Sequence, residues 1–380
     1  MNIIFLTTNY SLRTSGGIGS YIHTTGNGLV RAGHKVTVVS PVITERNDGL
    51  YSLCKIGSEV VALRRRLELS KIFYSKLLEL NDDKPIDVVE ATDWGMEAFD
   101  SRIGNKFPVV MRLHTPNSVV DKLNGYSRLK DSSLVNESEA EYFLKVKYLS
   151  SPSKAMAQLA IDHYSVDENS VKVINNPVDI FCEQTGKPFF LKNSAVTRIG
   201  FLGRLEPRKG VYVFAESLKL IFDQIDDVES CFIGPDTRLS KGSTGNELRK
   251  CLSQWSERVS FLGHLDGVEK LVAIENCDLI VLPSLWENFP YACLESLVLG
   301  KYVIATQGSG FDEIITPGIN GTLVTPGDSK ALSEAVINAL ADKQHHVKFD
   351  NRKVVERFSV DKIIPEITNY YKWVKEKHGH

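Results

Sequence analysis

Short apolar runs alternate with segments of helical periodicity along the first half of the chain. The runs predict buried strands at residues 3–6, 35–42, 87–91, 108–114, 147–151 and 171–174. The segments between them predict helices at residues 18–32, 68–80, 95–103, 136–147 and 153–163. Strands that alternate with helices in this way are typical of a parallel, doubly wound sheet with both faces covered.

The same rhythm returns in the second half after a lapse between residues 178 and 197, where we expect an interdomain linker. Strands are expected at residues 198–202, 229–233, 259–262, 279–282, 302–305 and 322–324, with a helix at 210–222 and two or three helices after Asp328. The predicted fold class is therefore α/β, with two Rossmann-like domains at residues 1–180 and 181–361 and a last helix at about 362–380. Ligands of such sheets bind at the carboxyl ends of the strands.

Composition narrows the class of protein further. A chain of 380 residues is too long for one average core, which agrees with two domains. The net charge of −2 argues against a surface that binds nucleic acid as a whole. No apolar run is long enough to span a membrane, and no basic region precedes the first one, so we expect a cytoplasmic protein. The six cysteines form no CxxC pair and are expected to be reduced thiols rather than metal ligands.

Residues 291–299 are apolar on nearly every side, which is typical of a buried helix, yet Glu295 occupies their middle. A buried carboxylate without partners is costly, so we expect donors for Glu295 from the protein or from hydroxyls of a ligand. Glu287 precedes this helix. Asn288 is the expected N-cap, with Pro290 in the first turn and free backbone N–H groups at the helix start.

Two glycine-containing loops follow predicted strands and could meet phosphate. Arg204 and Lys209 leave the end of strand 198–202 together, and such a pair can clamp two phosphates. A solvated basic turn explains the same pattern. Gly16 and Gly17 precede a predicted helix, where backbone N–H groups favour anions, although a mobile glycine turn fits equally well.

Residues at strand ends in the first half allow two interpretations each. His114 would contact a substrate hydroxyl or would serve as a structural loop residue. Glu90 and Asp93 would face an acceptor or would cap the helix expected at 95–103. The helix near 63–80 has basic residues beside an amphipathic pattern, so it would rest on an anionic membrane or would be an ordinary solvated helix.

The motifs in this order resemble those of the retaining glycosyltransferases of family 4, whose fold is called GT-B. They are Gly16-Gly17, "GRLEPRKG" at 203–210 and "ENFPYACLE" at 287–295, and the likeness extends to "NNPVDIF", "GSGFDEII" and "GINGTLVTPGD". The resemblance implies two Rossmann-like domains facing a central cleft, with the C-terminal helix crossing back to the first domain. It departs from the usual motifs at Asn288, Pro177 and Asp312, where Gly, Gly and Pro are common.

The resemblance also implies roles for the residues above. Arg204 and Lys209 would bind the donor diphosphate with help from Gly16 and Gly17, and Glu295 would hold the ribose hydroxyls. Glu287 and the backbone of Asn288, Phe289 and Pro290 would orient the donor sugar, and His114 would contact that sugar from the first domain. Glu287, His114, Arg204 and Lys209 are thus the expected catalytic residues. No metal or other cofactor is implied.

The expected reaction moves a hexose-type sugar from a UDP-, GDP- or ADP-sugar to an acceptor hydroxyl, with retention, in glycan, polysaccharide or glycolipid synthesis. The acceptor would be a saccharide or a lipid-linked saccharide, with peripheral contact to the inner face of the membrane. A sugar-nucleotide epimerase, a sugar phosphorylase and a catalytically silent partner subunit that binds a nucleotide sugar are the alternatives. Turnover by the isolated chain would exclude the silent subunit.

Overall fold

The computed structural model describes residues 1–8, 10, 16–41, 52–55, 63–125, 132–179, 196–239, 242–342 and 352–378. Most of the expected linker at 178–197 lies outside these residues. The chain divides into two compact units. Unit 1 comprises residues 1–122, 126–179 and 358–380, and unit 2 comprises residues 123–125 and 180–357.

Unit 1 is built on a seven-stranded parallel sheet in the order β3-β2-β1-β4-β5-β6-β7. Its strands are β1 (Asn2–Leu6), β2 (Lys35–Ser40), β3 (Ser52–Lys55), β4 (Val88–Thr92), β5 (Val109–Arg112), β6 (Tyr148–Ser151) and β7 (Val171–Val173). In the centre, Phe5 pairs in register with Val38 on one side and Glu90 on the other. The central strands are buried throughout, which explains why they appear in the sequence as nearly continuous apolar runs. Strand β3 was not predicted.

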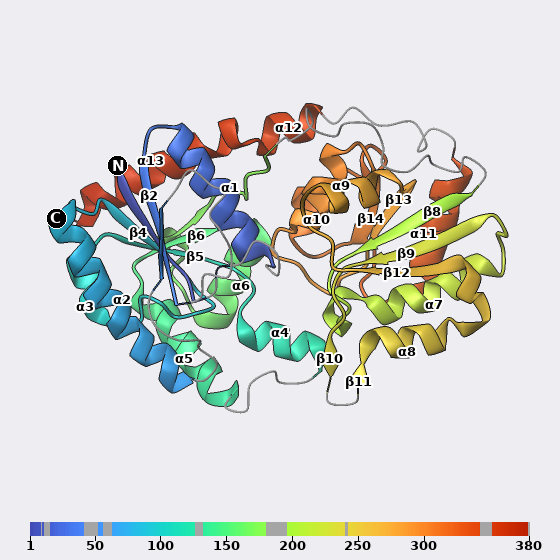
Figure 1. Ribbon diagram of the computed structural model, residues 1–380, viewed down its shortest axis with the longest axis horizontal. Coiled ribbons are helices and arrows are strands. Elements are labelled where there is room, and N and C mark those ends of the chain that lie inside the picture. The colour runs from blue at the N-terminus through green and yellow to red at the C-terminus, as the bar shows by residue number, and fades with distance from the viewer. Residues whose placement is uncertain are drawn as a thin grey trace. The chain divides into compact units, whose positions relative to one another are not determined.

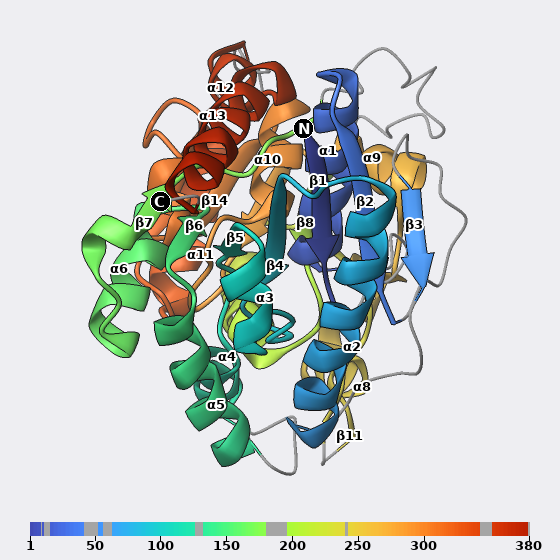
Figure 2. The same cartoon turned by 90° about the vertical axis from the view of Figure 1, so that its left-hand side faces the viewer.

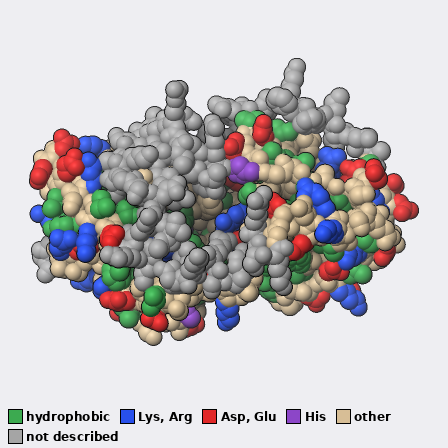
Figure 3. Space-filling model, turned by 60° about the horizontal axis from the view of Figure 1, so that its bottom comes forward, with side chains coloured by type: hydrophobic (Ala, Val, Ile, Leu, Met, Phe, Trp, Pro, Cys, Tyr) green, Lys and Arg blue, Asp and Glu red, His purple; other side chains and the backbone are tan. Residues whose placement is uncertain are grey.

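Helices cover both faces of this sheet. They are α1 (Gly17–Arg31), α2 (Leu63–Asp83), α3 (Ser101–Lys106), α4 (Asn117–Asn124), α5 (Ser132–Lys145), α6 (Lys154–Tyr164), the 3-10 turn η1 (Glu168–Ser170) and α13 (Val360–His378). Figure 1 shows α1 and α13 on one side of the sheet and α2 and α3 on the other, as a doubly wound sheet requires. The face drawn in Figure 3 carries acidic and basic side chains interspersed among its coloured residues, in keeping with the small net charge.

The last helix, α13, completes the core of unit 1. It packs beside α1 (Figures 1 and 2), and Gly28 of α1 lies against Ile364. The hydroxyl of Tyr371 donates to the buried carboxylate of Glu90, and that of Tyr370 donates to the carbonyl of Leu149 at 3.0 Å. The prediction that the C-terminal helix returns to the first domain is confirmed.

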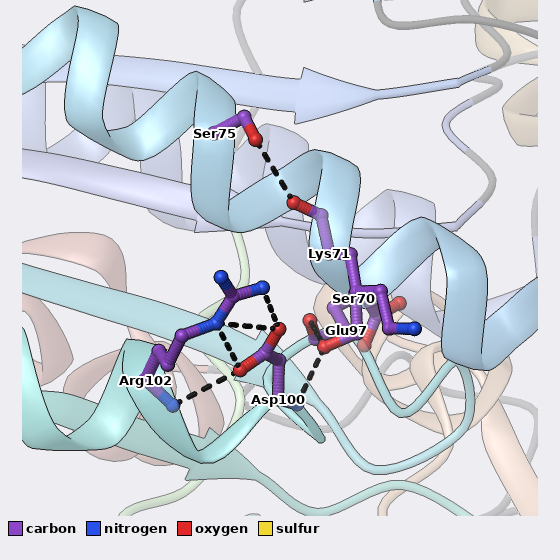
Figure 4. A network of polar contacts seen from close by, with 6 residues as sticks. All are labelled: Ser70, Lys71, Ser75, Glu97, Asp100 and Arg102. Carbon is purple, nitrogen blue, oxygen red and sulfur yellow. Dashed lines mark hydrogen bonds and ion pairs between the residues drawn. The ribbon is translucent and has the colours of Figure 1, made fainter.

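The helix predicted at residues 95–103 is wrong, because the chain makes turns up to Asp100 and the helix begins only at Ser101. Figure 4 shows the contacts that fix these turns: Ser70 Oγ donates to the carbonyl of Glu97 at 2.9 Å and accepts from the N–H of Asp100 at 2.7 Å. Asp100 is the N-cap of α3, and its side chain accepts from the N–H of Arg102. The contacts of a distant helix therefore override the local periodicity. Helix α4 was also not predicted.

Unit 2 contains a six-stranded parallel sheet in the order β12-β9-β8-β13-β14-β15 and a small hairpin, β10 with β11. The strands are β8 (Thr197–Leu202), β9 (Val228–Ile233), β10 (Arg238–Leu239), β11 (Gly242–Ser243), β12 (Val259–Gly263), β13 (Leu279–Leu282), β14 (Tyr302–Thr306) and β15 (Gly321–Val324). All six strands predicted for this half are confirmed. The core gathers the stacked or tilted rings of Phe201, Phe214 and Phe232.

The helices of unit 2 cover both faces of its sheet. They are η2 (Pro207–Lys209), α7 (Val211–Phe222), α8 (Thr244–Cys251), η3 (Ser253–Arg258), α9 (Gly267–Glu275), α10 (Tyr291–Val298), η4 (Gly310–Glu313), α11 (Ser329–Ala341) and α12 (Arg352–Phe358). Figure 1 shows α7 and α8 on one face, and α9 and α10 on the other. The chain thus has the predicted α/β class, with one Rossmann-like sheet in each unit.

Candidate functional site

Three loops of unit 2 meet where neighbouring parallel strands end. Strands β8, β13 and β14 are adjacent in the sheet, so their carboxyl ends lie at one edge. The loop after β8 carries Arg204 and Lys209, and the loop after β13 carries Glu287. Residues that are about 80 positions apart in sequence are therefore brought together, as expected for a ligand site of an α/β sheet.

Lys209 and Glu287 form a buried ion pair at this edge. Lys209 Nζ donates to Glu287 Oε1, which also accepts from Ser284 Oγ at 2.8 Å, and the side chain of Glu287 is only 6% exposed. Burial lowers the pKa of Lys209, although Glu287 opposes the effect. Burial alone would raise the pKa of Glu287, but the charges of Lys209 and Arg208 outweigh it and lower that pKa. Glu287 is therefore ionised near neutral pH, with Lys209 as its partner.

Close backbone contacts hold the three loops against one another. The N–H of Leu285 donates to the carbonyl of Arg208 at 2.8 Å. Gly210 has a φ of +71°, and a Cβ there would lie 1.9 Å from the carbonyl oxygen of Pro283. Gly310 donates its N–H to the carbonyl of Glu287 at 2.8 Å. These glycines are required by close approach, and the ion pair sits in a rigid frame.

Glu206 holds two further cations of the loop after β8. Its Oε1 lies 2.8 Å from Arg208 Nε and 3.4 Å from Arg204 Nη2. Glu206 and Arg208 are buried, whereas the side chain of Arg204 is 41% exposed. Arg204 can therefore reach a ligand while Glu206 fixes its position. Glu206 and Arg208 were not predicted as site residues, although "EPRKG" shows them beside Lys209.

The backbone before α10 differs from the prediction. Helix α10 begins at Tyr291 with Pro290 as its N-cap, so Asn288 is not the cap. Instead, Asn288 Oδ1 accepts the N–H of Phe289 at 2.6 Å, and that N–H is not free for a ligand. Asp312, where the resemblance leads us to expect Pro, completes a capping box with Ser309.

Glu295 lies in the middle of α10 as predicted, but it is not deeply buried. Its side chain is 20% exposed, and Lys270 Nζ on α9 lies 2.6 Å from its Oε1. The donor expected for Glu295 is thus a lysine of the neighbouring helix, 25 residues away. Nothing in residues 291–299 points to this lysine, because it lies on another helix.

His114 belongs to unit 1 and follows strand β5. Its N–H donates to Asp93 Oδ2 at 2.8 Å, and its ring packs edge-on against Tyr21 at 6.0 Å. Burial, and then the charge of Arg112, lower the pKa of His114 to about 3, so the ring is neutral at pH 7. Its buried Nε2 has no hydrogen-bond partner among the residues that the structure describes. A neutral imidazole with a spare nitrogen can contact a hydroxyl.

The two acids near His114 do not have the roles weighed for them. Glu90 is buried under Tyr21 and Tyr371, which both donate to its Oε2, so it is not a surface for an acceptor. Asp93 is fully buried and holds the N–H of His114. Neither caps a helix at residues 95–103, because the cap of α3 is Asp100.

The remaining predicted positions are Gly16 and Gly17 at the start of α1 and the surface of α2. Gly16 is the N-cap of α1 and Gly17 its first residue; both are exposed, and a Cβ on either would meet open space. In α2, the apolar residues Leu69, Phe73 and Leu77 are buried, and Arg66 is buried with its Nη1 on the carbonyl of Trp94 at 2.8 Å. The apolar side of α2 is therefore part of the core, which favours the solvated-helix interpretation.

Three further observations concern metals, thiols and membranes. Within the described ranges, no group of three or more His, Cys, Asp or Glu side chains could hold a metal ion. Cys231, Cys251, Cys277 and Cys293 are free thiols, as expected, while the side chains of Cys54 and Cys182 lie outside the described part. No helix in the described part of the chain is both long and apolar enough to cross a bilayer.

Comparison with known proteins identifies the family. Residues 15–180 match Glycosyltransferase Family 4, and residues 185–354 match Glycosyl transferases group 1. An uncharacterised glycosyltransferase of Methanocaldococcus jannaschii is 26% identical over the whole of both chains. Sucrose-phosphate synthase from Thermosynechococcus elongatus superposes with a TM-score of 0.80 at 16% identity, over 99% of each chain. Anabaena HepE in complex with UDP-glucose gives 0.74 at 19% identity, over 97% of this chain and 99% of that one. With the GT-B neighbours and both halves matched, this chain belongs to the family 4 glycosyltransferases.

Proposed function

We propose that the chain is a retaining hexosyltransferase that uses a UDP-, GDP- or ADP-sugar and needs no metal ion. The observation that carries this proposal is the gathering of Arg204, Lys209 and Glu287 at one edge of the unit 2 sheet. The two cations match the diphosphate of a sugar nucleotide, and the carboxylate matches the hydroxyls of its sugar. A neighbour solved with UDP-glucose supports the same donor class.

Each of these residues has a task in the proposed reaction. The bond between the anomeric carbon and the phosphate oxygen breaks, and the acceptor hydroxyl gives its proton to that oxygen as the new glycosidic bond forms on the same face. Arg204 and Lys209 stabilise the negative charge that develops on the departing diphosphate, an effect typically of about 3–4 kcal/mol per removed donor. Glu287 accepts hydrogen bonds from the sugar hydroxyls, and His114 donates or accepts one through its spare Nε2.

The role of Glu295 in binding the ribose is less well supported than the sequence alone suggested. It can hold the ribose hydroxyls only if it shares its carboxylate with Lys270 or releases that lysine. The acceptor is a saccharide or a lipid-linked saccharide. The surface of α2 gives little support for membrane contact, because Leu69, Phe73 and Leu77 face the core and leave Ile72 as an isolated exposed apolar side chain.

The test is nucleoside diphosphate release by the purified full chain with UDP-glucose, GDP-mannose and ADP-glucose, with and without EDTA. We expect one donor to be consumed, with EDTA harmless and the anomeric configuration kept in the NMR spectrum of the product. Lys209→Ala should abolish release. Lys219→Ala removes a partly exposed lysine of α7 that pairs with Glu216 and should leave release unchanged. If no donor is bound or cleaved, and Lys209→Ala changes nothing, the proposal is wrong.

A further inference from the structure

Arg208 is a buried cation of the candidate site to which the proposed reaction assigns no task. Its side chain is 7% exposed, and its Nε contacts Glu206 at 2.8 Å. Its Nη1 has no hydrogen-bond partner among the residues that the structure describes. A guanidinium carries five donors, and a buried donor without an acceptor is costly, so the protein retains a spare donor here at the expense of stability.

The backbone fixes Arg208 beside the loop that carries Glu287. The carbonyl of Arg208 accepts the N–H of Leu285 at 2.8 Å, two residues before Glu287. Gly210, two residues after Arg208, lies against the carbonyl of Pro283. The main chain at Arg208 therefore cannot shift without breaking the frame of the site, and Glu206 holds its guanidinium at 2.8 Å. Its charge also reaches Glu287, where it follows burial and Lys209 among the influences on the pKa.

Binding of a donor would draw Lys209 away from Glu287, and Arg208 is the next positive charge that acts on this carboxylate. In this structure Lys209 is the partner of Glu287, yet in the proposed reaction its ammonium moves to the diphosphate. Glu287 would then be a buried carboxylate whose remaining hydrogen bond from the described residues is the one donated by the hydroxyl of Ser284. A buried carboxylate that loses its counter-charge takes up a proton. A protonated Glu287 would be a weaker acceptor for the sugar hydroxyls.

We propose that Arg208 is a positioning residue that keeps Glu287 ionised and in place when Lys209 turns to the donor diphosphate. The inference rests on the proposed function. Glu206 still pairs with Arg204 and Arg208. The spare Nη1 donor of Arg208 then takes over the contact to Glu287. Glu287 thus stays charged while its partner changes from Lys209 to Arg208.

Proton uptake on donor binding tests this role directly. UDP-glucose is suited to the measurement, because its diphosphate is a diester with no proton to gain near neutral pH. We would titrate UDP-glucose into the full chain at pH 6.5 by calorimetry, in two buffers of different ionisation enthalpy. Wild type and Arg208→Lys should bind without net proton uptake. Arg208→Gln should take up close to one proton per UDP-glucose and bind roughly tenfold more weakly.

The acid limb of kcat supplies a second measurement, because kcat reports the pKa values of the enzyme–donor complex. Loss of the Arg208 charge raises the pKa of Glu287, so this limb should move to higher pH in Arg208→Gln and stay in place in Arg208→Lys. Arg198→Gln is the control, because Arg198 pairs with Glu229 at the opposite end of β8 and both are partly exposed. Arg198→Gln should behave as wild type in both measurements.

The outcomes separate this inference from the function on which it rests. If wild type binds UDP-glucose and Arg208→Gln keeps the wild-type proton count and pH profile, the role of Arg208 is refuted. Equal loss of binding in Arg208→Lys and Arg208→Gln without proton uptake would also refute it, since only the packing of arginine would then matter. If wild type binds none of UDP-glucose, GDP-mannose and ADP-glucose, the proposed function fails, and the inference fails with it.

Discussion

Replacing Lys209 by methionine should destabilise unit 2 as well as stop the reaction, because the ion pair with Glu287 is buried. Removal of one partner of a buried pair costs about 3–5 kcal/mol. Glu287 retains the hydroxyl of Ser284 at 2.8 Å, so we expect a value near the lower end, about 3 kcal/mol. Glu287→Gln should cost less, about 1–2 kcal/mol, because Lys209 is 19% exposed and can turn its ammonium toward water.

The double variant distinguishes a paired interaction from two separate effects. Lys209→Met with Glu287→Gln removes both charges, so neither partner is left buried alone. We expect it to be more stable than the sum of the single variants predicts, by about 2 kcal/mol. That coupling energy is the interaction between Lys209 and Glu287 that is lost when Lys209 turns to the donor diphosphate.

Hydrogen exchange is the appropriate assay, since a two-unit chain need not unfold in one step. Mass spectrometry of peptides from β8 and β13 reports the opening of unit 2 alone. A loss of about 3 kcal/mol corresponds to exchange that is faster by roughly a hundredfold. Lys219→Met should change these peptides by less than about 0.5 kcal/mol, as an exposed pair predicts. Additivity of the single variants to within about 0.5 kcal/mol would refute the buried ion pair.

Three further variants test other parts of the structure. Burial raises the pKa of Glu97 from 4.5 to about 7. The protonated carboxyl therefore makes its full contribution to stability below pH 4.5, and this contribution is lost as the pH rises through 7. In urea unfolding, Glu97→Gln should therefore gain on wild type by up to about 3 kcal/mol between pH 4.5 and 8. Gly210→Ala should cost more than about 2 kcal/mol in thermal unfolding and weaken UDP-glucose binding in calorimetry, because its Cβ would collide with the carbonyl of Pro283. Tyr371→Phe removes a donor from the buried Glu90 and should speed hydrogen exchange in α13, by an amount equivalent to about 1–3 kcal/mol.

Each of these predictions has an outcome that contradicts it. A stability difference between Glu97→Gln and wild type that stays constant with pH would mean that burial does not raise the pKa of this carboxyl. Gly104→Ala is the control for Gly210→Ala, because a Cβ at Gly104 in α3 meets open space, and equal effects of the two would exclude the collision. Unchanged exchange in α13 of Tyr371→Phe would show that apolar packing alone anchors this helix.

Much of the fold was predictable because buried parallel strands are apolar on both faces. All six strands of the unit 2 sheet were predicted, and α10 was recognised as a helix with Glu295 in its middle. Strand β3 and helix α4 were missed, since both are short. The helix predicted at 95–103 failed for a different reason: Ser70 on α2 holds the chain in turns up to Asp100.

The candidate site was predictable in its charges but not in its pairings. Arg204, Lys209 and Glu287 could be found from their places after strands, and the structure brings them to one edge of a sheet. The partner of Glu295 could not be found, because Lys270 comes from another helix. Nor could sequence distinguish Arg208, which is buried, from Arg204, which is exposed, because nearby positions in one loop give no sign of which side chain points inward.

The return of α13 to unit 1 affects the order in which the protein is made. Glu90 is synthesised early, but its partner Tyr371 follows about 280 residues later, after the whole of unit 2. At about 5–20 residues per second, a ribosome needs on the order of ten seconds or more to cover that distance. During this time the face of the first sheet that α13 will cover is exposed to solvent or to chaperones. Unit 2 can fold before the unit that precedes it is complete.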